Sequence, residues 1–375
     1  MSSRPGKGGD MDYLEPSAPR SPDTSLLDVR DLKTMFRTSR GLVRAVDGVS
    51  ISVERGQTLG VVGESGSGKT VLSRSIMGLL PAHNVVREGH VYFDGQDLVG
   101  LSTADMRHIW GAEIAMVFQD PMTSLNPVVK IGRQISEGLR LHLKMSKDKA
   151  RETAVELLRS VKIPEPERRL DQFPHELSGG MRQRVMIAIA IACGPKLLMA
   201  DEPTTALDVT VQAHILDVLQ EKQRERDMAM ILVTHDLGVV AGRTDEIAVM
   251  YAGKVVERAP TRTLFAEMKM PYTEALLKSI PRIEYPSHTR LLAITGRPPD
   301  LVSPPPGCNF APRCPYAQER CHVDEPPLMP GDTPGHEFAC WYPVGTPEGK
   351  AALEANIAAR RPQTVAAVGV IEVGA

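Results

Sequence analysis

The chain has 375 residues, of which 42% are hydrophobic and 24% charged, and its 44 basic residues nearly balance 46 acidic ones. This length suggests two domains, and the formal net charge of -2 does not indicate a surface for nucleic acid or lipid. The longest uninterrupted apolar run, Val185 to Cys193, is about half of what a membrane span needs. The N-terminus carries no apolar signal segment. We therefore expect a soluble cytoplasmic protein that can still dock onto a membrane partner.

The first 25 residues are polar and rich in Pro, Ser, Gly and Arg, which predicts a disordered N-terminal tail (1–25). Strands are predicted to begin at Leu26 and to run over 45–53. Between them lies Phe36, in a basic segment that resembles a turn. A lone aromatic residue says little by itself. Phe36 is therefore either an adenine-stacking platform or an ordinary core or surface side chain.

A phosphate-binding pattern follows. It fits G-x-x-x-x-G-K-[ST] at every fixed position and consists of Gly63, Glu64, Ser65, Gly66, Ser67, Gly68, Lys69 and Thr70. An apolar strand is predicted before it and a helix after it, which is the context that the motif requires. The glycines let backbone N–H groups close around phosphate oxygens, and the helix N-terminus adds its positive dipole end. We expect Lys69 to reach the β- and γ-phosphates and Thr70 to ligate Mg²⁺.

A helical insertion is predicted in the middle of the chain. A strand over 114–118 ends at Gln119, and a turn-rich stretch, 120–127, follows between prolines. From there to Leu177 the apolar spacing is mostly helical and predicts no strand. Ser178 then stands where a helix N-cap belongs. The two glycines after it, Gly179 and Gly180, would let another molecule approach the backbone, which suits a second phosphate contact.

Two more apolar strands end in polar residues that can carry chemistry. The first ends in Asp201 and Glu202, and a loop containing Asp208 leads into the next helix. The second, over 229–234, ends at His235, and a hairpin is predicted around 252–253. In an open α/β sheet, ligands bind at the carboxyl ends of the strands. Each residue alone could be an ordinary turn or a satisfied polar side chain, but their combination favours a site.

These motifs, in this order, resemble the ATP-binding cassette ATPases of ABC transporters, and the resemblance covers about Leu26 to Pro260. The 118–127 stretch and the cysteines after Pro260 resemble the ATPase subunits of oligopeptide and dipeptide importers. The fold implied is an α/β P-loop NTPase with a RecA-like core, an antiparallel β subdomain and an α-helical subdomain. The expected parts are the ATPase domain (26–260, its helical subdomain about 120–185), a C-terminal extension (261–345) and a flexible tail (346–375).

ATP hydrolysis transfers a phosphoryl group to water, so catalysis depends mainly on the charge and position of the groups around the phosphates. Asp201 would bind Mg²⁺, directly or through water, and Glu202 would orient and deprotonate the attacking water. His235 would contact the γ-phosphate or the water and keep Glu202 aligned. Gln119 would complete the metal and water shell. Because Glu202 and His235 are both present, we expect hydrolysis and not a purely regulatory protein.

The resemblance also implies partners. In the family, the signature residues Ser178, Gly179 and Gly180, with Asp208 nearby, face the nucleotide of a second cassette. The resemblance therefore implies a head-to-tail dimer that encloses two ATP molecules, and it favours two different ATPases as the pair. Two transmembrane permeases and an extracytoplasmic peptide-binding protein would complete the importer. Contact with the cytoplasmic face of the membrane would come through the permeases, which touch the 120–127 segment. The alternative for that segment is a rigid structural turn.

Four of the five cysteines cluster late in the chain: Cys308, Cys314, Cys321 and Cys340. Intervening prolines predict that loops present them, and no C-x-x-C chelate of the kind typical for zinc occurs. A [4Fe–4S] cluster held by four cysteines is favoured, and some peptide-importer ATPases carry one here. Zinc, with His322 or His336 joining, and unmetallated thiols remain alternatives. Cys193 is expected to be a buried small residue.

The function favoured by the sequence is therefore ATP hydrolysis that powers peptide uptake. Importers of nickel, haem or other small solutes share much of the pattern and remain an alternative. A non-transport ABC ATPase of DNA repair or translation is a third possibility. Such proteins usually carry two cassettes or long inserts, which this sequence lacks, and its charge balance does not favour nucleic acid.

Overall fold

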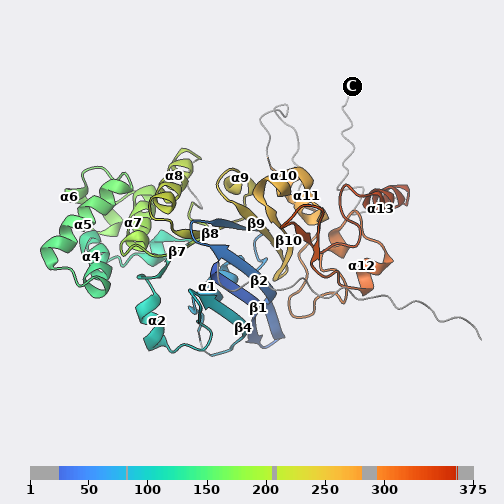
Figure 1. Cartoon of the computed structure of the whole chain (residues 1–375), viewed down its shortest axis with the longest axis horizontal. Helices are drawn as coiled ribbons and strands as arrows, with labels where there is room; N and C mark the ends of the chain where they lie inside the picture. Colours follow the sequence, from blue (N-terminus) through green and yellow to red (C-terminus); the bar gives the residue numbers. More distant parts are fainter. Residues whose placement is uncertain (1–24, 82, 205–208, 281–293, 360, 362–375) are drawn as a thin grey trace, which may run out of the picture.

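The computed structural model describes residues 25–81, 83–204, 209–280, 294–359 and 361. Two sheets lie at the centre, a group of helices lies at one end and the C-terminal extension lies at the other (Figure 1). The predicted disordered tail lies outside the described residues except for Ser25. None of the helices in the described ranges is long and apolar enough to cross a membrane.

The larger sheet has eight strands in the order β11-β12-β10-β9-β3-β8-β7-β6. Five neighbouring strands, β9, β3, β8, β7 and β6, run parallel to one another. Each of the other three, β10, β12 and β11, pairs antiparallel with its neighbour. The parallel strands are β3 (Thr58–Val62), β6 (Ile114–Val117), β7 (Leu197–Asp201), β8 (Ala229–Thr234) and β9 (Glu246–Tyr251). The antiparallel strands are β10 (Lys254–Pro260), β11 (Met329–Pro330) and β12 (Glu337–Phe338). The strands predicted at 58–62 and 229–234 are confirmed.

Both faces of the parallel strands are buried. Successive side chains of a strand point to opposite faces, and here Val61 packs into one hydrophobic cluster while Val62 packs into the other. The same alternation divides Met199 from Leu198 and Ile231 from Leu232. Such burial on both sides explains why these strands are continuous apolar runs in the sequence.

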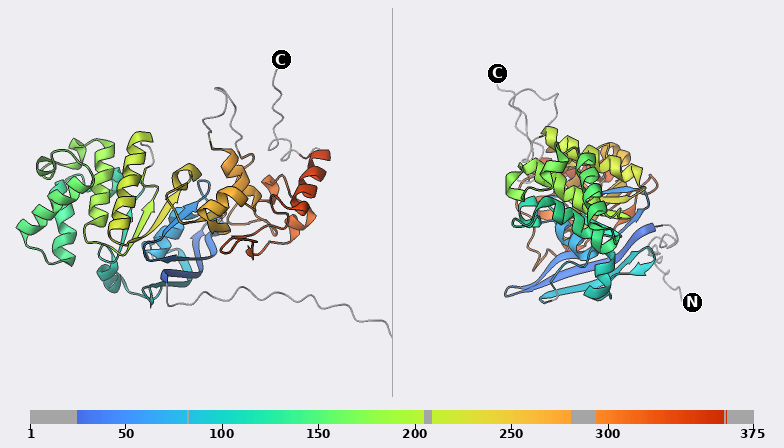
Figure 2. Two further views of the ribbon diagram at one scale, coloured as in Figure 1. Left: turned by 45° about the horizontal axis from the view of Figure 1, so that its top comes forward. Right: turned by 90° about the vertical axis from the view of Figure 1, so that its left-hand side faces the viewer.

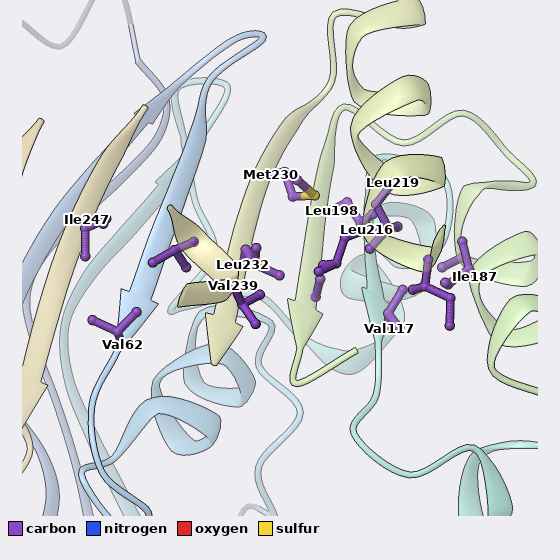
Figure 3. Packing of buried hydrophobic residues seen from close by; sticks show 14 of the residues in the cluster. Val62, Val117, Ile187, Leu198, Leu216, Leu219, Met230, Leu232, Val239 and Ile247 are labelled. Atoms are coloured by element: carbon purple, nitrogen blue, oxygen red, sulfur yellow. The ribbon is translucent and has the colours of Figure 1, made fainter. Parts of the chain in front are cut away.

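Helices cover one face of this sheet. Ile187 of α7 (Gly179–Ile191) and Leu216 and Leu219 of α8 (Val209–Glu225) pack with Leu198 and Val117 of the strands (Figure 3). The helical elements between β6 and α7 are α3 (Pro121–Ser124), α4 (Ile131–His142), α5 (Lys147–Ser160), α6 (Pro166–Arg169) and a 3-10 turn (Pro174–Glu176), and α4 to α6 form the far end of the molecule (Figure 1). The described part of 118–177 contains no strand, which confirms the predicted helical insertion.

The smaller, antiparallel sheet covers the opposite face and forms a separate layer (Figure 2, right). Its order is β2-β1-β4-β5, and its strands are β1 (Ser25–Thr38), β2 (Gly41–Glu54), β4 (Val85–Phe93) and β5 (Gln96–Asp97). Helix α1 (Lys69–Ile76) packs against both sheets through Leu72 and Ile76, and α2 (Thr103–Ile109) follows β5. The basic segment does contain a turn, at Ser39 and Arg40, but Phe36 itself lies in strand β1. Strand β1 continues there because Phe36 pairs with Val43 on one side and Val85 on the other.

The C-terminal extension continues the larger sheet, because β12 pairs with β10. Its core residues, Phe310 and Phe338 among them, belong to the same hydrophobic cluster as one face of the parallel strands, so the extension shares their core. After α9 (Leu237–Val240), its helical elements are α10 (Thr261–Glu267), α11 (Pro271–Lys278), a 3-10 turn (Ala311–Arg313), α12 (Glu319–Val323) and α13 (Pro347–Ala358).

Helix α13 corrects the prediction that a flexible tail begins at 346. Thr346 caps this helix, since its Oγ1 accepts a hydrogen bond from the N–H of Gly349 at 3.1 Å. Near its end Asn356 is buried, and its Nδ2 donates to the carbonyls of Pro315 and Ala317 at 2.8 and 3.0 Å. A capped helix with a satisfied buried amide is a packed element. Residues 362–375 lie outside the described part of the chain.

A fully buried carboxylate joins the extension to the sheet. Glu257 of β10 accepts hydrogen bonds from the N–H groups of Lys269 and Met270, and the Nε2 of His336 lies 2.9 Å from its Oε1. All three partners belong to the extension. Because burial makes a charge costly unless it is fully hydrogen-bonded, Glu257 fixes where these segments sit.

Replacing Glu257 with alanine should lower the free energy of unfolding by about 3 kcal/mol, because it leaves buried donors without an acceptor. Urea denaturation followed by circular dichroism measures this. The matched control is Glu354→Ala on the exposed side of α13, expected to change the value by less than about 0.5 kcal/mol. Equal stability of the two variants would show that Glu257 is not an anchor.

Candidate functional site

The carboxyl ends of four parallel strands meet at one edge of the larger sheet. The register aligns Val62 with Thr234, and Val233 with Asp201. The phosphate loop follows β3, and Glu202 and His235 follow β7 and β8 directly. Gln119 follows β6, two residues after its end. The structure thus brings together the candidate residues that the sequence placed at strand ends.

The phosphate loop is closed around its lysine. The Lys69 Nζ donates hydrogen bonds to the carbonyls of Gly63 and Glu64 at 2.7 and 2.9 Å. Lys69 is buried, and burial lowers its pKa, whereas the nearby carboxylates of Glu202, Asp201 and Glu64 act in the opposite direction. The cation is therefore held inside the loop where phosphate oxygens would enter.

Two positions of the loop require glycine. A Cβ on Gly63 would lie 2.2 Å from the carbonyl oxygen of Met250, and one on Gly68 would lie 2.2 Å from that of Ala45. Gly68 also has a φ of +104°, which side chains rarely adopt. Both strands behind the loop therefore approach it as closely as backbone allows, and helix α1 starts directly from this turn.

Asp201 has the surroundings of a cation ligand. Its Oδ1 accepts a hydrogen bond from the Thr70 Oγ1 at 3.1 Å, while its buried Oδ2 has no hydrogen-bond partner among the described residues. Burial raises the pKa of Asp201, opposed by the Thr70 hydrogen bond. The hydroxyl of Ser67 is likewise buried without a partner in the described part of the chain. An unpaired carboxylate oxygen beside a threonine hydroxyl fits the oxygen ligands that Mg²⁺ prefers.

Glu202 is turned away from its neighbour Asp201. Its φ is +45°, and its N–H donates to the carbonyl of Val233 at 2.9 Å. The carboxylate lies between two other strand ends. Its Oε2 accepts a hydrogen bond from the Gln119 Nε2 at 2.9 Å, and its Oε1 lies 3.2 Å from the Nδ1 of His235. This carboxylate is thus oriented on both sides and suits the role of a general base.

The other predicted site residues lie elsewhere. Ser178 caps α7, as predicted, with its Oγ accepting from the N–H of Met181 at 3.3 Å. Gly179 and Gly180 begin that helix, which lies in the helical part of the molecule and apart from α1 (Figure 1). Phe36 is partly buried in β1 of the antiparallel sheet. Asp208 lies outside the described residues.

Sequence reasoning missed one residue that links the signature to the catalytic edge. Gln183 of α7 is buried, and its Nε2 donates to the carbonyl of Pro203 at 2.5 Å. Pro203 follows Glu202 directly. The available signal was a polar residue within the apolar side of the signature helix. Gln183 therefore ties the start of α7 to the segment that carries Glu202.

Sequence reasoning also missed that the extension reaches the phosphate loop. Arg313 forms a two-pronged ion pair with the Glu64 carboxylate at 2.6 and 2.9 Å, and the Tyr272 hydroxyl accepts a hydrogen bond from the Glu64 N–H at 2.7 Å. These pairs span 249 and 208 positions of sequence. No local pattern predicts contacts at such separations.

The four late cysteines line a single pocket, together with Met270, Pro271, Ala311, Tyr316, Pro326, Trp341 and Tyr342. Burial raises the pKa of each thiol, that of Cys308 to about 11. No group of three or more His, Cys, Asp or Glu residues in the described ranges is arranged to hold a metal ion. Cys321 lies on α12, so the expectation that only loops present the sulfurs was wrong for this one.

The histidines that the zinc alternative invoked are not among the residues lining this pocket. His336 is instead paired with Glu257, and His322 is exposed on α12. Cys193 also differs from expectation. It is half-buried and follows the end of α7, because that helix stops at Ile191.

Known proteins resemble this chain over most of its length. It is 52% identical over 307 residues to the oligopeptide transport ATP-binding protein OppD of Bacillus subtilis (strain 168), covering 82% of this chain and 86% of that one. The chain belongs to the ABC transporter family. The ABC transporter family pattern matches residues 46–205, and that of the oligopeptide/dipeptide transporter C-terminal region matches 256–321.

The chain is also similar to other members of the ABC transporter family. The dipeptide transport ATP-binding protein DppD of Escherichia coli (strain K12) is 49% identical, over 85% of this chain and 97% of that one. Among solved structures, a dimeric post-hydrolysis state of the ATP-binding cassette MJ0796 with ADP and Pi matches with a TM-score of 0.58 and 27% identity. That match covers 63% of this chain and 99% of that one.

The two matched regions meet at the phosphate loop. The ABC transporter match contains the loop and Glu202, whereas Tyr272 and Arg313 lie within the match to the oligopeptide/dipeptide transporter C-terminal region. This second match also contains three of the four pocket cysteines and ends at Cys321. The contacts on Glu64 therefore join two separately recognised parts of an ABC transporter subunit.

Replacing Glu202 with glutamine should lower ATP turnover by at least about 100-fold, because the amide cannot take a proton from water. ATP should still bind, since Lys69 and the loop are unchanged. Phosphate release measures turnover, and retention of labelled ATP measures binding. Glu225→Gln, at an exposed carboxylate that pairs with Lys222, is the control and should turn over normally. Normal turnover by Glu202→Gln would remove this residue from the role of base.

Proposed function

We propose that this chain is the ATPase subunit of an importer of di- or oligopeptides. The observation that carries the proposal is the meeting of the phosphate loop, Asp201, Glu202 and His235 at one sheet edge. The printed names of the relatives, which are oligopeptide and dipeptide transport proteins, support the peptide as cargo. The match to the oligopeptide/dipeptide transporter C-terminal region supports the same choice over nickel or haem.

ATP is hydrolysed with the residues in distinct roles. Lys69 and the amides of the loop would hold the phosphates, and Thr70 with Asp201 would hold Mg²⁺, which would neutralise phosphate charge. Glu202 takes the proton of the attacking water. His235 and Gln119 keep the Glu202 carboxylate oriented, through the contacts of 3.2 and 2.9 Å described above. Phe36 as a stacking partner for adenine remains a prediction.

A second ATPase subunit completes each nucleotide site. Ser178, Gly179 and Gly180, with Asp208, would face the phosphates bound to the partner. The open surroundings of Gly179, where an added Cβ would meet nothing within 4 Å, support such an approach. The dimeric state of the similar cassette MJ0796 supports the same arrangement. Analysis of the subunits in the purified complex distinguishes a second copy of this chain from a different ATPase.

The permeases dock at the helical end of the molecule, on the cytoplasmic face of the inner membrane. Val128, next to the 120–127 segment, is 79% exposed, and Leu141 of α4 is 60% exposed. A groove lies beside Lys130 and between α4 and α5. Leu141 lines this groove, whose other lining residues are mostly charged, and exposed apolar side chains are typical of a protein interface. Gln119 at the start of this segment would transmit the state of the nucleotide to the permeases, and a peptide-binding protein would deliver the cargo from outside.

We also propose that the four pocket cysteines hold a [4Fe–4S] cluster. All four line one pocket, yet no group in the described residues suits a single ion. A cluster accepts one thiolate at each corner, so it needs sulfurs spread further apart than one zinc ion does. When bound, it would tie four segments of the extension together through iron–sulfur bonds. Its role is therefore structural.

Protein purified without oxygen should contain about four irons per chain and absorb near roughly 400 nm. Cys314→Ser should lose most of this iron, whereas the control Cys193→Ser should keep it, because Cys193 does not line the pocket. Metal analysis and absorbance measure both. One zinc per colourless chain would support the zinc alternative, and metal-free protein would support simple thiols.

Cells lacking this chain should lose uptake of a labelled tripeptide, and restoring the chain should return it. Lys69→Ala should fail to restore uptake, because the phosphate loop loses its cation. Exposed Lys350→Ala on α13, away from the proposed permease groove, serves as the control for expression. Normal peptide uptake with loss of nickel or haem uptake would support the alternative importer. If cells without this chain take up peptide, nickel and haem normally, and the chain is absent from membranes that contain its permeases, a non-transport ATPase would be favoured.

A further inference from the structure

The C-terminal extension holds one residue of the phosphate loop by both its main chain and its side chain. Glu64 receives Arg313 on its carboxylate and Tyr272 on its N–H, at distances of 2.6 to 2.9 Å. Its carbonyl accepts from the Lys69 Nζ at 2.9 Å. Each polar group of Glu64 is thus engaged, two of them by residues from outside the ATPase core.

Arg313 is itself fixed in place. It is only 5% exposed, its Nε donates to the carbonyl of Thr295 at 2.9 Å and its Nη1 lies 3.2 Å from the Tyr251 hydroxyl. The guanidinium also lies 5.8 Å from the ring centroids of both Tyr251 and Phe310. A buried arginine with this many partners cannot swing away. Its position follows from the fold of the extension.

Three aromatic rings form the base of this contact. The centroids of Tyr251 and Tyr272 are 4.6 Å apart, and each lies 5.3 Å from that of Phe310. Tyr251 belongs to β9 of the ATPase core, while Tyr272 and Phe310 belong to the extension. Such a packed aromatic group is rigid. The position of the extension is therefore transmitted to Glu64 without a flexible link.

The charge of Glu64 gives this contact a consequence for the nucleotide. A carboxylate within the phosphate loop carries the same sign as the phosphates and would repel them. The two-pronged pair with Arg313 neutralises it and directs both oxygens toward the extension. Lys69 remains the cation that is available to the phosphates. Without Arg313, an unpaired negative charge would stand beside the bound triphosphate.

We propose that Arg313 is a positioning residue for ATP: it neutralises Glu64 and, with Tyr272, sets the phosphate loop in its binding conformation. The inference rests on the proposed ATP site. The segment between Cys308 and Cys314 carries both Phe310 and Arg313. The extension therefore forms one side of the proposed nucleotide site, and packing around the cysteine pocket fixes the segment that carries Arg313.

Arg313→Gln in the full chain should raise the Kd for ATP about tenfold, because Glu64 loses its counter-ion. The kcat at saturating ATP should stay within about twofold of the original, because Glu202 and His235 are untouched. Combining it with Glu64→Gln should return the Kd to within about threefold, since the neutral pair no longer repels phosphate. Titration with a fluorescent ATP analogue measures binding, and phosphate release measures turnover.

Arg320→Gln is the matched control, because Arg320 is exposed, belongs to the same extension and pairs with Asp324. It should bind ATP normally. An unchanged Kd in Arg313→Gln would overturn the inference. So would a double variant that binds as weakly as Arg313→Gln, because the loss would then come from damaged structure and not from charge. Thermal unfolding of each variant separates these cases. Failure of the unaltered chain to bind ATP would instead refute the proposed function itself.

Discussion

The parallel register of β9, β3, β8, β7 and β6 is the constraint on which the rest of the molecule depends. Because neighbouring strands end level with one another, residues that follow Val62, Val117, Asp201 and Thr234 meet at one edge. Burial on both faces specifies that register, since a slip by one residue would exchange the two hydrophobic clusters. A shift of one strand would separate Glu202 from either Gln119 or His235. The chemistry of the site is thus a consequence of how apolar side chains alternate within the sheet.

The C-terminal extension depends on the same sheet. Its strand β12 continues the sheet beyond β10, and the buried carboxylate of Glu257 binds main-chain groups and His336 of the extension. The aromatic group around Tyr251 then brings Arg313 to Glu64. The extension is therefore integrated with the phosphate loop, while helices α4, α5 and α6 lie at the opposite end of the molecule (Figure 1).

Sequence reasoning succeeded where a local pattern determines structure. The strand and helix around the phosphate loop, the Ser178 cap and the helical insertion all follow from short-range signals. It failed where pairing partners are distant. The basic residues around Phe36 indicated a turn, which lies at 39–40, whereas Phe36 itself belongs to β1 because it pairs with a strand on each side. Beyond 346 the alanine-rich composition indicated a tail, but Asn356 finds buried carbonyls about 40 positions earlier. The pair of Arg313 with Glu64, 249 positions apart, carries no local signal at all.

The adjacent carboxylates Asp201 and Glu202 show how one strand end can support two proposed roles. Asp201 continues β7, so its side chain stays buried beside Thr70, and burial raises its pKa. Glu202 leaves the strand with a φ of +45°, which costs about 1 kcal/mol for a residue with a side chain. The hydrogen bond from its N–H to Val233 offsets that cost and holds the turn. Without the positive φ, both carboxylates would follow strand geometry, and the second would not reach Gln119 and His235. The strained turn therefore separates the proposed cation ligand from the proposed base, and a residue that relaxed it would remove the base while leaving the cation site intact.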